Sequence, residues 1–210
     1  MAGNSKCKIC RRAGQKLFLK GEKCFSPKCP MIKKAYPPGR KGKRRVRGLS
    51  EYGREIREKQ KLKYWYGLRE RQFAKYVKEA LAERKKGQDI PSFLIKRLES
   101  RLDNAVFRLG LANSRAQARK LITQKHFLIN GKPVNFPSFE FKKGGLISVK
   151  PASLKKTYFK NLNLTLKKYQ PPAWLELDKD KLEGKMIGEP TLEETNVPVE
   201  IPIILEFYSR

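Results

Sequence analysis

The stretch IPSFLIKRLESRLDNAVFRLG, residues 90–110, decides the fold of the central part of this chain. Its apolar residues recur at three- and four-residue spacings, which is typical of a helix that buries one face. Pro91 stands near its start, and Gly110 follows as a stop signal. The sequence therefore predicts one helix over residues 90–110, with a core-facing stripe of Leu94, Ile95, Leu98, Leu102, Ala105, Val106 and Leu109.

Charged residues follow the two flanks of this stripe. Arg97, Arg101 and Arg108 lie along one flank, while Glu99 and Asp103 lie beyond the other. This pattern favours an arginine ridge beside the core, with the acids turned away from it. The alternative is a solvated charged flank with no partner of its own.

The tripeptide RLD at 101–103 resembles the catalytic aspartate motif of pseudouridine synthases. A catalytic aspartate needs a pocket with convergent polar groups, whereas this one lies inside an amphipathic helix. Asp103 is therefore interpreted as a solvated or paired helix carboxylate, and the chain as no enzyme.

Working outward, the next segment is NSRAQARKLITQKHFLINGKPVNF, residues 113–136. Ser114 and Gln117 form a capping box that opens a helix reaching about Gln124. On this helix Ala118, Leu121 and Ile122 share the apolar face, Arg119 and Lys120 point away from it, and Arg115 lies at its edge.

A small antiparallel sheet is expected after this helix. Asn130-Gly131 is a strong signal for a tight hairpin turn, and residues 146–149 read as a further strand. The single histidine, His126, lies at the helix–strand junction. It is interpreted as a hydrogen-bonding or RNA-contacting residue rather than a metal ligand.

The charge of the chain indicates a polyanionic partner. The 210 residues include 49 Lys and Arg against 20 Asp and Glu, which gives a formal net charge of +29. Self-repulsion on this scale disfavours a compact state unless nucleic acid neutralises it. The apolar runs are too short to span a bilayer, and the start lacks the apolar core of a signal peptide, so a cytosolic protein is expected. Residues 171–210 carry 9 acids and 4 bases, and we expect them to stay off the polyanion.

All four cysteines lie near the start, as Cys7-x2-Cys10 and Cys24-x4-Cys29. Two close pairs across a short hairpin, with residues 17–19 as a small strand, suit one structural zinc held by four thiolates. A four-thiolate iron–sulfur cluster and four reduced structural cysteines remain alternatives. A catalytic zinc is not expected, because four sulfur ligands leave no position for water.

The segment YPPGRKGKRRVRG, residues 36–48, combines prolines, glycines and six basic residues. It is interpreted as a basic arm that orders along a phosphate backbone, with a solvated linker as the alternative. Two helical patterns follow, over residues 50–67 and 70–87. Residues 64–66 (YWY) either stack on bases or belong to the core.

Several motifs together resemble one family. The region 101–149 resembles an RNA-binding module shared by a small-subunit ribosomal protein, tyrosyl-tRNA synthetases and pseudouridine synthases. The chain as a whole is similar to the family of small ribosomal subunit protein four, in its zinc-bearing form. The motifs that carry this likeness are YPPG (36–39), EKQKL (58–62), YGLRERQF (66–73), LESRLDNAVFRLG (98–110), SRAQARKL (114–121) and EFYSR (206–210).

The resemblance implies a primary binder of small-subunit ribosomal RNA that nucleates assembly of the body of the particle and contributes to translational accuracy. It implies contacts with small-subunit proteins five and twelve, a place near the path of messenger RNA into the particle, and a cytoplasmic ribosomal location. Lys125 departs from the family, because many relatives have glycine before the histidine at this junction. That leaves the local turn conformation open.

The expected fold class is α+β. We expect a zinc module and basic arm over residues 1–48, a helical domain over 49–90 completed by a strand within 170–210, and an inserted RNA-binding module over 91–169 with two to three helices and a small antiparallel sheet. The alternative function is a zinc-dependent nucleic-acid-binding regulator outside the ribosome. The expected RNA contacts are Arg11, Arg12, Arg44, Arg45, Arg47, Arg57, Lys59, Lys61, Arg101, Arg115, Arg119, Lys120 and Lys125.

Overall fold

The computed structural model describes residues 3–39, 48–83, 87, 89–166 and 169–209. The chain divides into two compact units, of which unit 1 comprises Met1–Pro91 with Val197–Arg210 and unit 2 comprises Ser92–Asn196. One expected boundary is wrong: residues 170–196 belong to unit 2 and do not complete the first domain. None of the described helices is long and apolar enough to cross a membrane.

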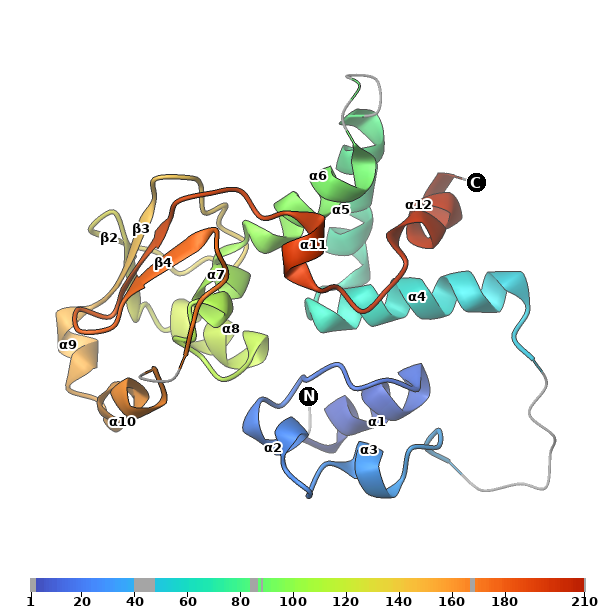
Figure 1. The fold of residues 1–210 in the computed structure, drawn as a ribbon, viewed down its shortest axis with the longest axis horizontal. Coiled ribbons are helices and arrows are strands. Elements are labelled where there is room, and N and C mark those ends of the chain that lie inside the picture. Colours follow the sequence, from blue (N-terminus) through green and yellow to red (C-terminus); the bar gives the residue numbers. More distant parts are fainter. Residues whose placement is uncertain (1–2, 40–47, 84–86, 88, 167–168, 210) are drawn as a thin grey trace. The chain divides into compact units, whose positions relative to one another are not determined.

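Unit 1 is built from helices. Its first segment contains three short ones, and two longer helices follow (Figure 1). Ser50 begins the first of the longer helices by accepting a hydrogen bond from the Gly53 N–H at 3.2 Å. The bounds are α1 (Gly3–Ala13), α2 (Glu22–Phe25), α3 (Pro30–Lys33), α4 (Glu51–Trp65) and α5 (Glu70–Glu83).

The predicted hairpin around the cysteines is wrong. Cys7 and Cys10 lie on helix α1, and residues 17–19 form no strand. The two glycines do turn the chain, because Gly14 has φ 72° and Gly21 has φ 63°, a left-handed region that glycine enters without steric cost. These turns connect helices rather than strands.

The C-terminal segment returns to unit 1 as a helix, α12 (Ile201–Ser209), where a strand was expected. It lies against α4 and α5 (Figure 1). Ile201 and Ile204 are buried, and their three-residue spacing places both on one helical face. Short apolar runs fit a strand and a helix alike, so packing on two helices decides the conformation.

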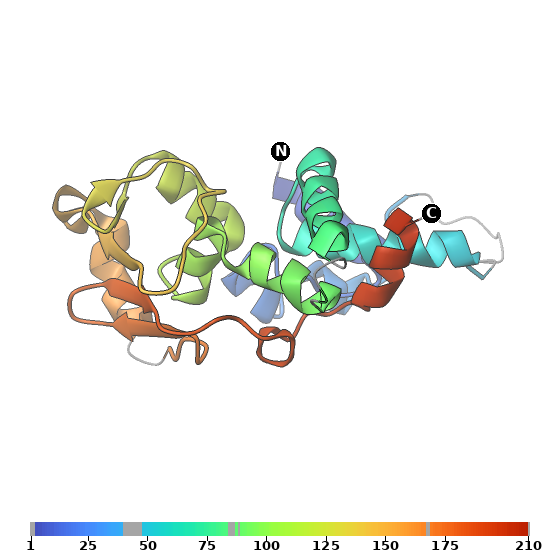
Figure 2. The same ribbon diagram turned by 90° about the horizontal axis from the view of Figure 1, so that it is seen from above.

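Unit 2 contains a five-stranded antiparallel sheet in the order β2-β1-β3-β5-β4. Figure 2 shows the orange-red strands from the tail beside the rest of this sheet. The expected α+β class with a small antiparallel sheet is confirmed, and the sheet is larger than the sequence indicated. The strands are β1 (Phe127–Ile129), β2 (Lys132–Pro133), β3 (Leu146–Val149), β4 (Leu175–Asp178) and β5 (Glu183–Met186).

The single helix predicted over residues 90–110 is wrong, because two helices occupy it: α6 (Ile90–Glu99) and α7 (Leu102–Arg108). Between them Arg101 is extended, with φ −70° and ψ 138°. The Leu102 N–H donates to the Phe139 carbonyl at 2.8 Å, and the Ser100 carbonyl accepts from the Phe141 N–H at 2.7 Å. These bonds to a distant loop replace those that would continue the helix.

The next helix, α8 (Arg115–Thr123), begins as predicted. The Ser114 hydroxyl accepts from the Gln117 N–H at 3.3 Å, and the Gln117 side chain accepts from the Asn113 N–H at 3.0 Å. The Asn130-Gly131 turn is also confirmed, with φ 48° and 79° at its two residues. Three further helices complete unit 2, namely α9 (Pro151–Leu154), α10 (Thr157–Leu166) and α11 (Leu192–Thr195).

The core of unit 2 joins α7, α8, α10 and the sheet. Ala118, Leu121 and Ile122 are buried in it, as their predicted face requires. From the predicted stripe over residues 94–109, the C-terminal half, beginning at Leu102, contributes to this cluster. Gly184 on β5 lies so close to Leu109 that an added Cβ would stand 2.3 Å from its Cδ1.

Candidate metal centre and nucleic-acid interface

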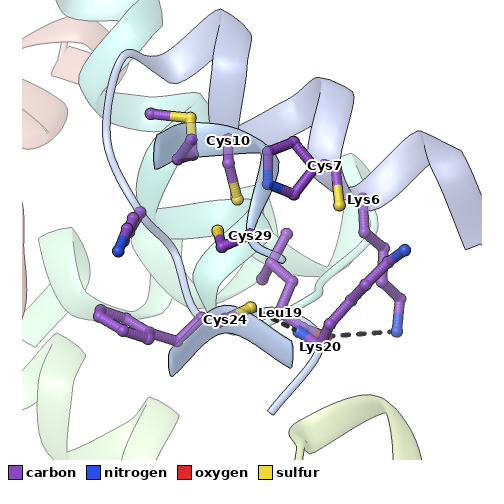
Figure 3. Close-up of a pocket in the computed structure, with 11 residues that line it drawn as sticks. Lys6, Cys7, Cys10, Leu19, Lys20, Cys24 and Cys29 are labelled. Atoms are coloured by element: carbon purple, nitrogen blue, oxygen red, sulfur yellow. Dashed lines mark hydrogen bonds between the residues drawn. The ribbon is translucent and has the colours of Figure 1, made fainter. Parts of the chain in front are cut away.

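The four cysteines line one pocket of unit 1 (Figure 3). Cys7 and Cys10 lie three residues apart on α1 and therefore share a helical face. Cys24 lies on α2, and Cys29 directly precedes α3. The pocket that they line has a volume of about 10 Å³, which suits an ion or one water molecule rather than an organic ligand.

The surroundings of the thiols fit thiolate ligands of a cation. The Lys20 backbone N–H donates to the Cys24 Sγ at 3.4 Å, and Lys6, Lys16 and Lys20 line the same pocket. Burial raises the pKa of the Cys10 thiol; the backbone hydrogen bond with Leu17 opposes this, while the neighbouring cysteines add to the rise. Four thiolates so placed need a positive charge among them.

The spacing of the sulfur atoms is wider than in a closed metal site. Among the residues that the structure describes, the group of three candidate ligands with all donor atoms within 4.8 Å of one another is Glu51, Glu55 and Glu206. The four Sγ atoms therefore surround the pocket without gathering that tightly, and all four are free thiols. Four thiolates are a donor set that fits zinc, although the four Sγ atoms lie farther apart than the ligands of a bound zinc ion.

In unit 1 the structure brings three of the predicted RNA contacts together. Arg12 from α1 with Arg57 and Lys61 from α4 line one groove of about 320 Å³, beside Tyr64. Arg11 lies apart from them, because its Nε donates to the Tyr36 carbonyl at 2.9 Å. Arg44, Arg45 and Arg47 of the basic arm lie outside the described residues.

Lys59 does not occupy the surface position expected of an RNA contact. It is buried, and its ammonium donates to the Glu70 carboxylate at 2.8 Å while lying 4.5 Å from the centre of the Phe207 ring. Lys63 donates to the same carboxylate at 2.7 Å, and the Tyr208 hydroxyl donates to it at 3.0 Å. This network attaches α12 to α4 and α5, so the role of Lys59 is structural.

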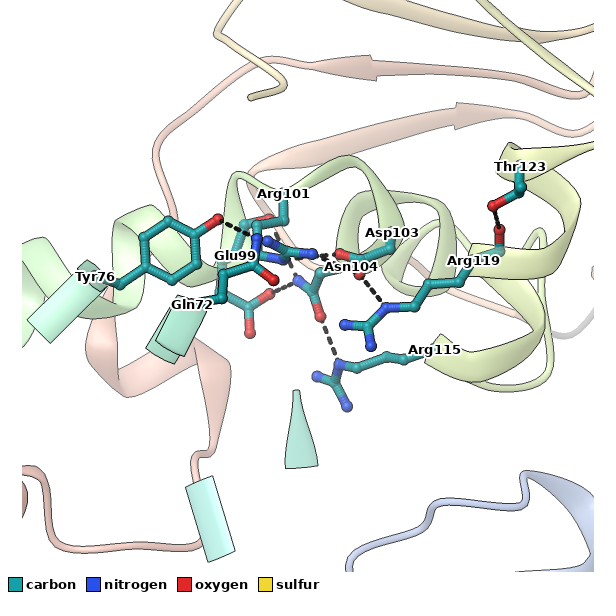
Figure 4. A network of polar contacts seen from close by, with 9 residues as sticks. All are labelled: Gln72, Tyr76, Glu99, Arg101, Asp103, Asn104, Arg115, Arg119 and Thr123. Atoms are coloured by element: carbon teal, nitrogen blue, oxygen red, sulfur yellow. Dashed lines mark hydrogen bonds and ion pairs between the residues drawn. The ribbon is translucent and has the colours of Figure 1, made fainter. Parts of the chain in front are cut away.

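The predicted arginine ridge of unit 2 is also wrong, because both acids pair with arginines instead of turning away from them. Figure 4 shows Asp103 with its partners Arg101 and Arg119. Arg101 is 4 % exposed and forms a bidentate pair with Asp103 at 3.1 and 2.9 Å. The same Asp103 accepts from Arg119 Nε at 2.5 Å. Asp103 is thus the paired carboxylate that the sequence allowed, buried rather than solvated, and Arg119 does not simply point outward.

A second buried acid continues this network. Glu99 accepts two hydrogen bonds from Arg108, at 3.1 and 2.9 Å, and one from the Asn104 amide. The Asn104 carbonyl oxygen accepts from Arg115 Nε at 2.7 Å (Figure 4). Buried charges need such partners, because an unpaired buried ion is costly. The two acids therefore hold the α7–α8 pair together.

Exposed cations of unit 2 lie elsewhere. Lys120 and Lys125 are exposed, as an RNA contact requires. Sequence reasoning missed Lys150 and Lys156, which lie beside the buried His126. Burial is the larger cause of the lowered pKa of the His126 ring, and the charges of these two lysines add to it. The signal was present in the sequence, because residues 141–175 contain 8 lysines and no acid.

Two family models match consecutive parts of the chain. Residues 3–99 match the family model "Ribosomal protein S4/S9 N-terminal domain", and residues 100–147 match the model "S4 domain". Proteins named small ribosomal subunit protein uS4 are similar from end to end. Those of Halothermothrix orenii and Syntrophobacter fumaroxidans are each 46% identical, over 97% and 99% of this chain and 96% and 98% of their own lengths. That of Kosmotoga olearia is 43% identical over 97% of this chain and 96% of its own length.

Proposed function

Because the chain belongs to the family of small ribosomal subunit protein uS4, we propose how its parts serve the ribosome. It is a structural, RNA-binding component of the small ribosomal subunit and not an enzyme. One observation of the structure supports this role best. In unit 2 the acids Glu99 and Asp103 are buried and paired with arginines. Exposed cations therefore remain available to bind a phosphate backbone, namely Lys120, Lys125, Lys150 and Lys156.

Sedimentation tests this role in the cell. The untagged chain should travel with small ribosomal subunits in a lysate gradient and leave them in high salt, since its contacts with RNA are largely ionic. A nucleic-acid-binding regulator outside the ribosome would instead stay near the top of the gradient. That distribution would contradict the proposal.

The finer part of the role is early assembly. We infer that the chain binds small-subunit ribosomal RNA first, nucleates the body of the particle and supports accurate decoding, with small-subunit proteins five and twelve and messenger RNA as neighbours. Exposed cations on each unit support this, namely Arg12 and Arg57 on unit 1 and Lys120 and Lys125 on unit 2, because each unit can then bind RNA itself. In stepwise reconstitution, adding the chain last should leave particles incomplete, whereas adding it first should not.

We infer that Cys7, Cys10, Cys24 and Cys29 hold one structural zinc. The support is the convergence of four thiols from three helical segments on an ion-sized pocket. Bound zinc would neutralise the thiolates and stabilise a small module that has little apolar core of its own. With four sulfur ligands it would have no open position for chemistry.

Metal analysis of the purified chain should find one zinc per molecule. Replacing two ligands, Cys24→Ser with Cys29→Ser, should abolish zinc binding, whereas the control Ser26→Ala in the same loop should retain it. A stoichiometric iron–sulfur absorption spectrum, or purified chain that binds no added zinc, would contradict the assignment.

A further inference from the structure

Around His126, three chain segments bring lysines together on the surface of unit 2. Lys125 precedes the histidine, and the Lys150 N–H donates to the His126 carbonyl at 2.9 Å. Lys156 reaches the ring itself, with its ammonium 3.4 Å from Nε2. All three lysines are exposed, whereas His126 is buried.

The histidine acts as a neutral support beneath these cations. Its Nε2 lies 3.4 Å from the Lys156 ammonium and 3.1 Å from the Gln124 Oε1, and its Nδ1 lies 2.9 Å from the Ser153 hydroxyl. Burial, and after it the charges of Lys156 and Lys150, lower the pKa of the ring, which favours its neutral form. The T-shaped contact with Phe159, with ring centres 5.8 Å apart, fixes the ring from the core side. The ring thus orients Lys156 without adding a charge.

The surrounding sequence contains little to neutralise these lysines. Residues 104–175 include 14 Lys and Arg and one acid, Glu140. That acid pairs with Arg97 at 2.6 Å. Helix α10 also begins directly after Lys156, and its positive end adds to the local potential. Clustered cations at such a place favour an anion that touches several of them at once.

We propose that Lys125, Lys150 and Lys156, arranged around His126, form a phosphate-binding surface for the backbone of ribosomal RNA. This proposal rests on the ribosomal role proposed above and assigns it a place on unit 2. The three lysines recognise phosphate through charge, so they fix the position of an RNA strand and not its sequence.

The test compares two double variants of the full chain. Lys150→Gln with Lys156→Gln removes two cations of the surface, and glutamine at 156 can still donate toward His126. Lys181→Gln with Lys185→Gln is the matched control, because both lysines are exposed in unit 2, on strand β5 and the turn before it. The probe is a transcript of full-length small-subunit ribosomal RNA, titrated over a series of salt concentrations.

We expect the slope of log affinity against log salt to flatten by about 1.8 for the first variant, since each duplex phosphate contact contributes about 0.9. The control should flatten it by less than half as much, and both variants should melt like the wild type. Equal flattening in the two variants would overturn the surface and leave the proposed function standing. Failure of the wild type to bind this RNA would overturn the proposed function, and the surface with it.

Discussion

At the scale of single residues, Lys125 occupies a backbone conformation that suits glycine. Its φ is 58°, and it follows the last turn of α8. Its N–H donates to the Ile122 carbonyl at 2.8 Å, and the next N–H, of His126, donates to the Leu121 carbonyl at 3.2 Å. This is a Schellman motif, whose left-handed position is usually glycine. The departure from the family therefore changes the side chain and keeps the turn.

Lys125→Gly should raise the free energy of unfolding by about 0.5–1 kcal/mol, because glycine adopts this φ without a Cβ clash. It should at the same time weaken RNA binding, because a cation of the His126 surface is lost. Lys125→Ala is the control, which removes the charge and retains the strain. Urea unfolding of the three proteins provides the measurement, and a glycine variant no more stable than the alanine variant would contradict the turn assignment.

The residue scale also shows where sequence reasoning stops. Ser114 and Asn130-Gly131 were predictable, because a cap and a tight turn depend on neighbours in the chain. The partner of Arg119 was not predictable, because helical periodicity shows which way a side chain points but not which residue of another helix it meets. Asp103 belongs to another helix, and the contact between the two helices brings it to Arg119.

At the scale of elements, Glu70 attaches helix α12 to α4 and α5. Burial alone would raise the pKa of the Glu70 carboxyl, but hydrogen bonds from Lys59, Lys63 and Tyr208 outweigh it and lower the pKa to about 2. The ordinary value is 4.5. A depressed carboxyl pKa contributes stability that is complete above the unfolded value and is lost as the pH falls through the folded one.

Glu70→Gln should therefore destabilise the chain by about 1 kcal/mol near neutral pH, a modest cost because the carboxylate is half exposed and screened. Glu200→Gln is the matched control, since Glu200 pairs with Arg54 at 3.3 Å on the open surface, and its loss should cost less. Urea unfolding at several pH values should show the gap between wild type and Glu70→Gln closing between pH 4.5 and 2. A gap that stays constant over this range would contradict the network.

Element boundaries were less predictable than element types. The pattern over residues 90–110 has one continuous helical period, yet the backbone leaves the helix at Arg101. The cause is an isolated bridge between Arg101 and Glu140, 39 residues away in the chain. No local signal contains such a pairing, so the sequence predicts the apolar face and misses the break.

At the scale of the whole molecule, the tail is shared between the two units. Its strands β4 and β5 extend the sheet of unit 2, and α12 belongs to unit 1. The resemblance to the family had suggested that the whole tail, residues 170–210, returns to the first domain. Gly184 helps to keep β4 and β5 in unit 2, because the absence of a side chain lets β5 approach Leu109 closely. A sequence shows the glycine, but only the fold shows the close approach.

The charge of the whole chain predicts steep salt dependence, and the basic arm is expected to supply part of it. Replacing Arg44, Arg45 and Arg47 with glutamine should flatten the slope of log affinity for small-subunit ribosomal RNA by up to about 2.7, at about 0.9 per duplex phosphate contact. The matched control replaces Arg71, Lys75 and Lys78 with glutamine. These residues lie on the exposed face of α5, and their replacement removes the same amount of charge.

The comparison separates contact from net charge. Both triple variants lower the formal charge from +29 by three, so a purely long-range effect would change them equally. A larger change of slope in the arm variant means that the arm neutralises phosphates directly, because the slope depends on the number of phosphate contacts that release counterions. Equal slopes in the two variants would show that residues 40–47 only connect the cysteine module to the helices that follow.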